Sequence, residues 1–319
     1  MKPLEPERCS ARAPSAPTPG LTQTGTPRRD PQLTQSARRA DATASAKGHA
    51  SVAAILHTLL ALGAAATLLP LLWMISASLM PAGEATTLPP RLLPSTVTLE
   101  HYRALFLRLD LGRTLLNSAG LAAAITAISL LINSMAGYAF AKLDFRGREP
   151  LFRLLLAAMA IPGQVAMLPL FLLLRELGLI NSYWGVIVPG LASIFGIFLI
   201  RQYAESIPDT VLDAARIDGA GELQIYRSIV LPLSRPILVT LAIFTFLGAW
   251  NDFLWPLIIL TDSDKQTLPV ALAALVGEHV QDTELMMAGA VVTVLPVVVL
   301  FVALQKYYIA GLTSGALKG

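Results

Sequence analysis

Charged residues are scarce in this chain. Of its 319 residues, 14% are charged and 54% are hydrophobic, and the mean hydropathy is +0.61. A soluble domain typically carries about 25% charged residues. Length alone would suggest about two soluble domains, but the apolar residues are gathered in long runs. The composition therefore predicts a polytopic helical membrane protein.

Cysteine and histidine are also scarce, which excludes several kinds of site. The only cysteine is Cys9, so the chain has no intrachain disulfide and no cysteine-based metal site. The four histidines lie without the spacing of metal ligands, at His49, His57, His101 and His279. We therefore predict no metal site.

A catalytic constellation and a nucleotide-binding loop are absent as well. A membrane enzyme needs His, Asp, Glu or Ser side chains at matched depth, and the spans contain no such group. No Gly-rich loop ends in Lys-Ser or Lys-Thr, so the chain is not itself an ATPase. The formal net charge of +3 requires no nucleic acid to explain it. We predict no catalytic residue and no cofactor.

Residues 1–50 differ in composition from the rest. They are rich in Pro, Thr, Ala, Ser and Arg and lack hydrophobic periodicity, which is typical of a disordered tail. The first hydrophobic run begins far from the N-terminus and is too long for the apolar core of a cleavable signal. The sequence therefore predicts a disordered tail over 1–50 and one membrane domain over 51–319.

Six apolar segments are long enough to cross a membrane, since a bilayer core needs about 20 apolar residues per helix. Backbone groups inside lipid must be paired within the span, which favours helices. The predicted fold is an all-α bundle with spans near 52–77, 114–140, 151–174, 184–200, 237–260 and 286–308. Ile161-Pro162-Gly163-Gln164 and Pro169 interrupt the third span and predict a kink there.

The distribution of Lys and Arg predicts the orientation. With six spans, the tail, the loops 141–153 and 201–235 and the C-terminus lie on one side, and they carry 18 of the 24 Lys and Arg residues. Cytoplasmic loops carry the excess of these residues. Both termini and the loop 201–235 are therefore predicted to be cytoplasmic, in a multi-pass protein of the cell membrane.

Two loops are predicted to face outward, about 78–113 and about 261–285. The second is acidic, with Asp262, Asp264, Glu278, Asp282 and Glu284. Such a loop is either a solvated face or a docking surface for an extracytoplasmic partner, and the sequence leaves both open.

The loop at about 205–235 is polar, helix-forming and set between two long hydrophobic runs. Ser206 is predicted to cap a helix, with Pro208 and Asp209 in the first turn. Gly219 suits a left-handed turn that ends this helix. A second helix is predicted over 222–230, and Pro232 and Pro236 are predicted to close the unit.

The second helix carries a predicted apolar stripe at three- and four-residue spacing. The stripe contains Leu223, Tyr226, Ile229 and Val230.

The core of this loop has a specific spacing. Asp213-Ala214-Ala215 is followed by Asp218-Gly219 and then, after nine residues, by Ile229-x-Leu231-Pro232. This pattern resembles the coupling loop of permease subunits in ATP-binding cassette importers, where a cytoplasmic ATPase grips the membrane subunit. The resemblance implies that Ala214 and Ala215 allow close approach, and that Asp213 and Asp218 present charge to the partner. Asp213 stands where Glu is usual in that family, which keeps the charge on a shorter arm.

The resemblance covers about 50–319 and is strongest to the carbohydrate-type, maltose-like second permease. It is supported by Thr114–Ser118, Gly137–Ala141, Ala249–Phe253 and the C-terminal segment from Gly311. It implies a pathway for a sugar or related solute, a second related permease, and two cytoplasmic subunits that bind the ATP. It further implies an extracytoplasmic solute-binding protein and surrounding lipid.

Several polar residues lie in or beside the spans. Such groups usually face the bundle interior and mark either helix contacts or a substrate path. Candidates for the solute path are Asn117, Gln164, Trp250, Asn251 and Asp252. Packing is the alternative for Asn117 and also for Asn133, and Trp250 is either a sugar-stacking surface or a membrane anchor.

The competing function is a secondary transporter driven by an ion gradient. That class predicts charged residues deep in the spans and internal symmetry. Asp252 is the one candidate for such a charge.

Overall fold

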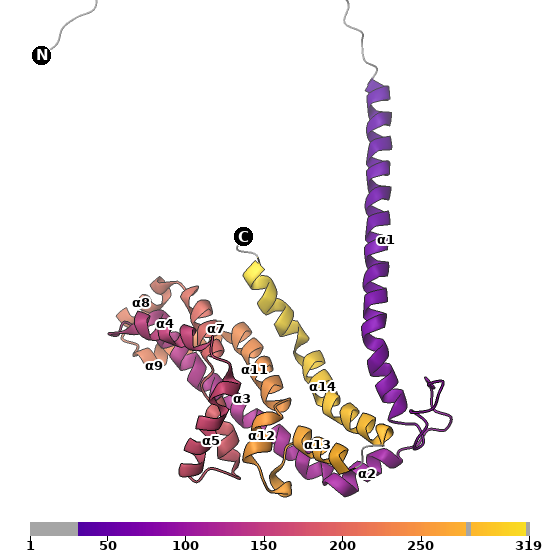
Figure 1. Cartoon of the computed structure of the whole chain (residues 1–319). Coiled ribbons are helices and arrows are strands. Elements are labelled where there is room, and N and C mark those ends of the chain that lie inside the picture. Colours follow the sequence, from indigo (N-terminus) through magenta and orange to yellow (C-terminus); the bar gives the residue numbers. More distant parts are fainter. Residues whose placement is uncertain (1–30, 279–281, 317–319) are drawn as a thin grey trace, which may run out of the picture. The chain divides into compact units, whose positions relative to one another are not determined.

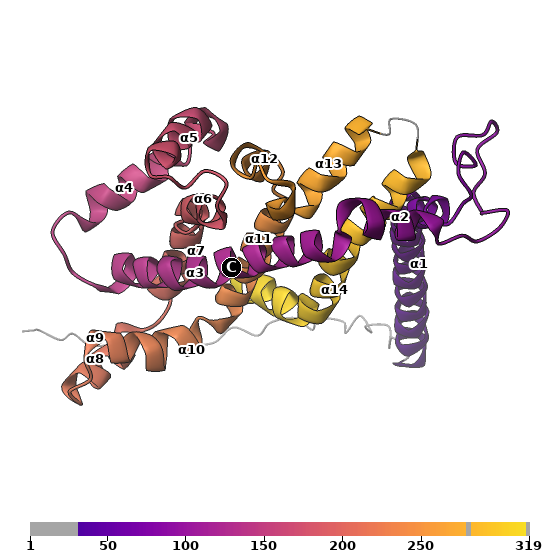
Figure 2. The same cartoon turned by 90° about the horizontal axis from the view of Figure 1, so that it is seen from below.

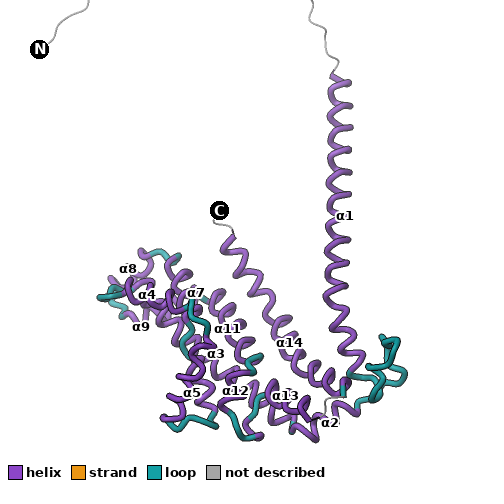
Figure 3. The backbone as a smooth tube through the Cα atoms, in the orientation of Figure 1, coloured by secondary structure: helices purple, strands orange, loops and turns teal. Residues whose placement is uncertain are grey.

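The computed structural model describes residues 31–278 and 282–316. The chain divides into two compact units, Met1–Ala66 and Thr67–Gly319, and each is described by itself. All regular structure among the described residues is helical (Figure 3). This confirms the predicted all-α class.

The described part of the first unit consists of helix α1, Pro31–Ala77, which continues into the second unit (Figure 1). Residues 1–30 of the predicted disordered tail lie outside the described residues. Over residues 31–50 the structure differs from the prediction, because this stretch is helical. The stretch contains six alanines, and alanine is the strongest helix former. Because the stretch has few large apolar residues, it shows no hydrophobic periodicity from which the helix could be predicted.

The second unit contains the remaining helices. Its first half comprises α2 (Glu100–Leu109), α3 (Leu111–Lys142), α4 (Arg148–Ala158), η1 (Gly163–Ala166), α5 (Met167–Glu176), α6 (Tyr183–Ile187), η2 (Val188–Gly190) and α7 (Ile194–Glu205). Its second half comprises α8 (Asp209–Ile217), α9 (Glu222–Ile225), η3 (Tyr226–Val230), α10 (Leu231–Leu233), α11 (Arg235–Trp250), α12 (Leu254–Ile259), η4 (Ser263–Lys265), α13 (Leu268–Glu278) and α14 (Thr283–Ala316).

Three stretches among the described residues are continuous apolar helices long enough to cross a membrane: Ala53–Ala77, Leu111–Lys142 and Thr283–Gln305. Three further pairs pass the same test but are bent. The bends are 95° between α4 and η1–α5, 41° between α6–η2 and α7, and 79° between the α9–α10 segment and α11. Counting each pair as one span gives up to six by length and composition. The third pair joins α9–α10, which falls in the predicted loop 201–235, to α11, so its bounds differ from those of the predicted fifth span.

The bend in the third span confirms the predicted kink. Helix α4 ends at Ala158, and Pro162 precedes η1, so the backbone turns at Met159–Pro162. Pro169 causes no interruption, because it lies in the first turn of α5, where a missing N–H removes no helical hydrogen bond.

The fifth span was wrongly predicted as one helix over 237–260. Helix α11 ends at Trp250, and Asn251–Phe253 separates it from α12. The Asn251 side chain donates to the Leu247 carbonyl at 2.9 Å. Asn and Asp side chains compete with the backbone in this way, and they favour helix ends over helix interiors.

Helix α3 packs against α7 and α11 in the middle of the second unit (Figure 2). At Gly137, an added Cβ would come within 2.6 Å of Ile200 Cγ2, so the two helices approach closely there. Asn133 is fully buried; it donates to Ser129 Oγ at 2.7 Å and accepts from the Ser193 N–H at 3.0 Å. Asn133 therefore has the packing role that was one of its two interpretations.

Candidate functional site

The predicted coupling loop begins with a helix at the predicted place but with a different cap. Helix α8 starts at Asp209, and Pro208 is its N-cap without a side-chain hydrogen bond. Ser206 does not cap α8, which corrects the prediction. Its hydroxyl donates back to the Tyr203 carbonyl at 2.7 Å, at the end of α7. A polar residue between two helices can form a hydrogen bond with the end of the first helix or with the start of the second. The sequence does not reveal which of the two helices it will bond to.

The turn between the two loop helices has the predicted backbone. Gly219 adopts φ +87°, a left-handed conformation that glycine adopts without a steric penalty. The Gly219 N–H donates to the Arg216 carbonyl at 3.0 Å, and the Ala220 N–H donates to the Ala215 carbonyl at 2.9 Å. This pair of bonds is the Schellman ending of a helix.

The second helix is longer than predicted. It runs from Glu222 to Leu233 as α9, the π turn η3 and α10, and Pro232 lies inside it. Within the π turn, the Leu231 N–H donates to the Tyr226 carbonyl, one residue further back than in an α-helix. The looser turn accommodates the proline, so the unit ends at Ser234 and Pro236 falls in the first turn of α11.

An apolar cluster anchors this loop. Its buried members are Tyr138, Ile207, Leu212, Ile225, Tyr226 and Val230. Of the predicted stripe, Tyr226, Val230 and the partly buried Ile229 belong to the cluster, whereas Leu223 is 61% exposed and was wrongly included. The π turn inserts an extra residue per turn, which moves the buried face to Ile225.

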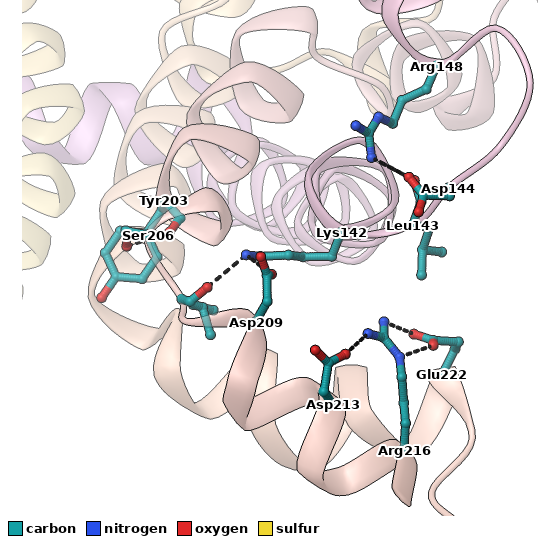
Figure 4. A network of polar contacts seen from close by, with 11 residues as sticks. Lys142, Leu143, Asp144, Arg148, Tyr203, Ser206, Asp209, Asp213, Arg216 and Glu222 are labelled. Atoms are coloured by element: carbon teal, nitrogen blue, oxygen red, sulfur yellow. Dashed lines mark hydrogen bonds and ion pairs between the residues drawn. The ribbon is translucent and has the colours of Figure 1, made fainter. Parts of the chain in front are cut away.

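Charged side chains fasten the two loop helices to each other (Figure 4). Arg216 donates to Asp213 Oδ1 at 2.8 Å and to Glu222 Oε1 at 2.8 Å. Glu222 also accepts from the Tyr138 hydroxyl at 2.6 Å. Hydrogen bonds from Arg216, and to a smaller extent from Tyr138, lower the pKa of Glu222. The hydrogen bonds of Arg216 to Glu222, and to a smaller extent to Asp213, raise the pKa of Arg216. The Asp213 charge is thus engaged within the loop.

Lys142 makes a second attachment. Its ammonium group donates to Asp209 Oδ1 at 2.6 Å and to the Ile207 carbonyl at 2.7 Å (Figure 4). The Lys142 side chain is 7% exposed, whereas the Asp209 side chain is 74% exposed, so the ammonium group is shielded from water on one side only. The hydrogen bond and the charge of Lys142 lower the pKa of Asp209. The sequence analysis missed Lys142, Tyr138 and the pairing of Arg216 with Glu222, because the partners come from separate helices.

The remaining surface of the loop is partly apolar. Val211, Ile217 and Leu223 are 43%, 86% and 61% exposed, and Ala214 and Asp218 are exposed between them in the chain. Of the other predicted coupling residues, Gly219 and Pro232 are exposed, whereas Ala215, Ile229 and Leu231 pack against the cluster. The surface can therefore offer apolar contact area and one carboxylate to another protein.

A cavity of about 560 Å³ lies in the second unit, at some distance in sequence from this loop. Its walls come from α3, η1–α5, α6–η2, the start of α7, α11 and α12. Gln164 and Asp252, two of the predicted solute-path residues, line it. So do Trp255, Phe195 and Phe244, which the sequence analysis did not select.

The other three predicted solute-path residues lie elsewhere. Trp250 is 2% exposed; its indole stacks on Phe246 and donates to the Thr293 carbonyl of α14 at 3.1 Å. Asn251 bonds back to its own helix. Asn117 donates to the Asp264 and Gln266 carbonyls and accepts from the Tyr183 hydroxyl. The structure thus brings together only Gln164 and Asp252 from this set.

Trp255, and not the predicted Trp250, is the tryptophan that lines the cavity. Its side chain is largely buried, and its indole N–H donates to the Gly185 carbonyl at 3.1 Å, which fixes the ring between α12 and α6. Phe195 and Phe244 meet edge to face across the same cavity, with ring centroids 6.4 Å apart. No group of His, Cys, Asp or Glu in the described part of the chain could hold a metal ion.

Comparison with known proteins gives consistent matches. Residues 129–313 match the family described as the binding-protein-dependent transport system inner membrane component. The chain is 43% identical to the arabinooligosaccharides transport system permease protein AraQ of Halalkalibacterium halodurans, over 78% of this chain and 91% of that protein. It is 38% identical to the trehalose transport system permease protein SugB of Mycobacterium tuberculosis, over 79% of this chain and 93% of that protein.

Among solved structures, the chain matches a bacterial ATP-binding cassette transporter involved in the import of the acidic polysaccharide alginate. The TM-score is 0.71 at 26% identity, and the match covers 80% of this chain and 95% of the other.

Proposed function

This chain belongs to the family of binding-protein-dependent transport system inner membrane components, the permease subunits of ATP-binding cassette importers, and we propose that it carries a neutral oligosaccharide. It resembles an importer permease in sequence and in fold, not a secondary transporter. The relatives named for arabinooligosaccharides and trehalose support a sugar as the solute.

The cavity is the observation that carries the choice of a neutral solute. Asp252 is the one charged residue among its lining, and aromatic rings of Trp255, Phe195 and Phe244 face the same space. Aromatic faces suit sugar rings, and Gln164 supplies an amide that can donate to and accept from hydroxyls. An anionic sugar would meet a like charge at Asp252. The alginate importer, named for an acidic polysaccharide, shares the fold and defines the alternative.

The coupling loop is the proposed seat of the ATPase. A folded hairpin of α8 and α9 presents Ile217, Leu223 and Ala214 to solvent, and Asp218, which follows Ile217 in the chain, is also exposed. Apolar side chains exposed together are typical of a protein contact. Two ATP-binding subunits would hydrolyse the ATP, and this chain would supply the membrane path.

The remaining partners and the orientation follow from the family and the charge distribution. A second related permease would complete the pathway, and an extracytoplasmic solute-binding protein would deliver the solute. The Lys and Arg excess supports a cytoplasmic coupling loop and cytoplasmic termini. Single cysteines at Arg216 and Lys265, with Cys9 replaced, should label from opposite sides of the membrane, and labelling of both from outside would overturn this orientation.

The identity of the solute can be tested by measuring ATP hydrolysis and uptake by the complete complex in proteoliposomes. A panel should contain neutral arabino- and gluco-oligosaccharides, an oligouronate and glycerol phosphate, each presented with the binding protein. We expect stimulation of ATP hydrolysis and uptake with a neutral oligosaccharide. Stimulation by the oligouronate or the phosphate ester alone would overturn the neutral assignment.

A further inference from the structure

Helix α3 is a continuous span of the second unit that contains no proline. It runs for 32 residues without a proline, whereas three other spans are bent by 41° to 95°. At 1.5 Å per residue its length is about 48 Å, more than a bilayer core. In its most apolar window 28% of the residues are buried, compared with 17% in α14. α3 is therefore longer than the hydrocarbon core is thick, and a larger share of it is buried than of α14.

One end of α3 holds both helices of the coupling loop. Lys142 bonds to Asp209 and to the Ile207 carbonyl at the start of α8. One turn earlier, the Tyr138 hydroxyl donates to Glu222 at the start of α9.

A third bond lies deeper in the same face. The hydroxyls of Ser134 and Tyr226 are 2.7 Å apart, and both residues are buried. Residues 134, 138 and 142 recur every four positions, so they form one stripe along α3. The stripe continues the apolar cluster that anchors the loop, which includes both Tyr138 and Tyr226.

The other end of α3 holds the loop between α12 and α13. Arg113 pairs with Asp264 at 2.8 Å, and Asn117 donates to the Asp264 and Gln266 carbonyls at 2.9 and 3.1 Å. Ser118 Oγ accepts from the Leu268 N–H at 2.7 Å, in a buried bond that starts α13. Figure 2 shows α8 and α9 beside one end of α3 and α13 beside the other.

We propose that α3 is a rigid strut that moves with the coupling loop and transmits its displacement to the 262–268 loop, with Lys142 and Tyr138 as the positioning residues. This rests on the proposed function, which makes the loop the seat of the ATPase and 262–268 an outward loop. The covalent routes out of the loop are less direct. Helix α7 joins its neighbour through a 41° bend and α11 joins the loop through a 79° bend, so neither belongs to a straight continuous span.

Distances between spin labels in the assembled complex test the strut directly. With Cys9 replaced, one label is placed at Thr210 on α8 and the other at Gly112 on α3, both exposed positions. The control pair is Thr210 with the exposed Leu173 on α5, beyond the 95° bend. Between nucleotide-free and ATP-bound complexes, we expect the strut pair to keep its distance and the control pair to change.

Either of two results would overturn the strut. The strut pair could change as much as the control pair, or neither pair could change. A wild-type complex that neither binds nor responds to the ATPase would instead contradict the proposed function, whatever the labels report.

Variants at the attachment test the positioning residues. Lys142→Met keeps the apolar stem and removes the donors, and Tyr138→Phe removes one oxygen. In the double variant we expect binding-protein stimulation of hydrolysis per assembled complex to fall about fivefold or more, a typical allosteric coupling, with a broadened strut distance. The single variant Lys142→Arg keeps the charge and the donors, and we expect it to retain most of the stimulation that Lys142→Met loses.

The matched control is Arg148→Met, because Arg148 pairs with Asp144 in its own segment (Figure 4). We expect that variant to retain full stimulation. If the double variant fails to assemble, Tyr138→Phe alone is measured in the same way. Unchanged stimulation and an unbroadened distance in the variant that assembles would refute the role of these side chains.

Discussion

The coupling loop and the cavity differ in how their side chains are held. In the loop, Arg216 joins Asp213 and Glu222, which lie three and six residues away, and all three are exposed to water. In the cavity, Trp255 is held by the Gly185 carbonyl, seventy residues away, and is largely buried. The loop therefore adds local, water-accessible charge contacts to its apolar cluster, whereas the aromatic ring of the cavity is held by contacts between distant segments. The first should respond to pH and salt, and the second to side-chain volume.

The largest expected effect is a loss of stability at Trp250, which lies in the core and not in the lining of the cavity. Trp250→Ala removes a 2% exposed indole that α14 covers. Truncating a buried aromatic residue typically costs about 3–5 kcal/mol. We expect a strongly lowered melting temperature and yield, with unchanged apparent affinity in the complexes that survive. Trp184→Ala is the control, since Trp184 is 57% exposed.

Uptake is measured per assembled complex, so that yield and transport are separated. A lower apparent affinity for solute at normal thermal stability would return Trp250 to the solute path.

Two glycine substitutions distinguish a site that is limited by side-chain volume from a site that is limited by backbone conformation. At Gly185, an added Cβ would collide with the Leu179 carbonyl oxygen and lie 2.9 Å from Ile259 Cγ2. At Gly219 there is open space but φ is +87°. Gly185→Ala should destabilise the whole unit by about 1–3 kcal/mol through overpacking. Gly219→Ala should cost roughly 1–2 kcal/mol, confined to the loop.

Thermal unfolding and copurification of the ATPase distinguish these two outcomes. We expect Gly185→Ala to lower the melting temperature of the membrane unit, and Gly219→Ala to weaken ATPase retention with little change in that temperature. A reversed pattern would break the distinction between the two regions.

The sequence predicts the loop better than the cavity for the same physical reason. Gly219 forms the predicted turn and Asp209 lies in the predicted first helical turn, and both are local features; the pairing of Asp209 with Lys142 of α3 is not local and was missed. The π turn that buries Ile225 in place of Leu223 depends on Pro232 and on the surface that the helix meets, which local propensity does not describe.

In the cavity, the sequence selected Trp250 beside Asp252, and the structure placed Trp255 there. The break at Asn251–Phe253 separates α12 from α11, and the helical periodicity of an unbroken span does not predict which side chains share a face across such a break. The six predicted segments nevertheless overlap the three continuous apolar helices and the three bent pairs, because hydropathy detects apolar residues even where the helix is bent.

The third prediction concerns the charge in the cavity. At an assumed separation of about 7 Å and an effective dielectric constant of about 20, two like unit charges repel by roughly 2 kcal/mol. Asp252→Asn should therefore improve the binding of an oligouronate by about thirtyfold and change that of a neutral oligosaccharide little. Competition for uptake in proteoliposomes measures both. An equal loss for both solutes would show that Asp252 contributes a hydrogen bond and not discrimination.

The smallest expected effect is the pH dependence of the loop. Arg216 and then Tyr138 lower the pKa of Glu222 below its ordinary value of 4.5, so the folded loop favours the ionised form. The stabilisation is complete above about pH 4.5 and is lost as pH falls through the lowered pKa. Because the Glu222 side chain is 45% exposed, solvent screening should limit it to at most about 1 kcal/mol.

The measurement is the difference in melting temperature between the native chain and Glu222→Gln, taken from pH 7 to pH 3. We expect a constant difference between pH 7 and 5 that shrinks below pH 4.5, because the native Glu222 becomes protonated and the Gln variant does not titrate. Salt at about 1 M should shrink the difference at pH 7 as well, since the Debye length falls to about 3 Å. Gly185→Ala should show neither dependence, as its defect is steric. A difference for Glu222→Gln that persists at pH 3 and in high salt would mean that Glu222 does not stabilise the loop through its charge.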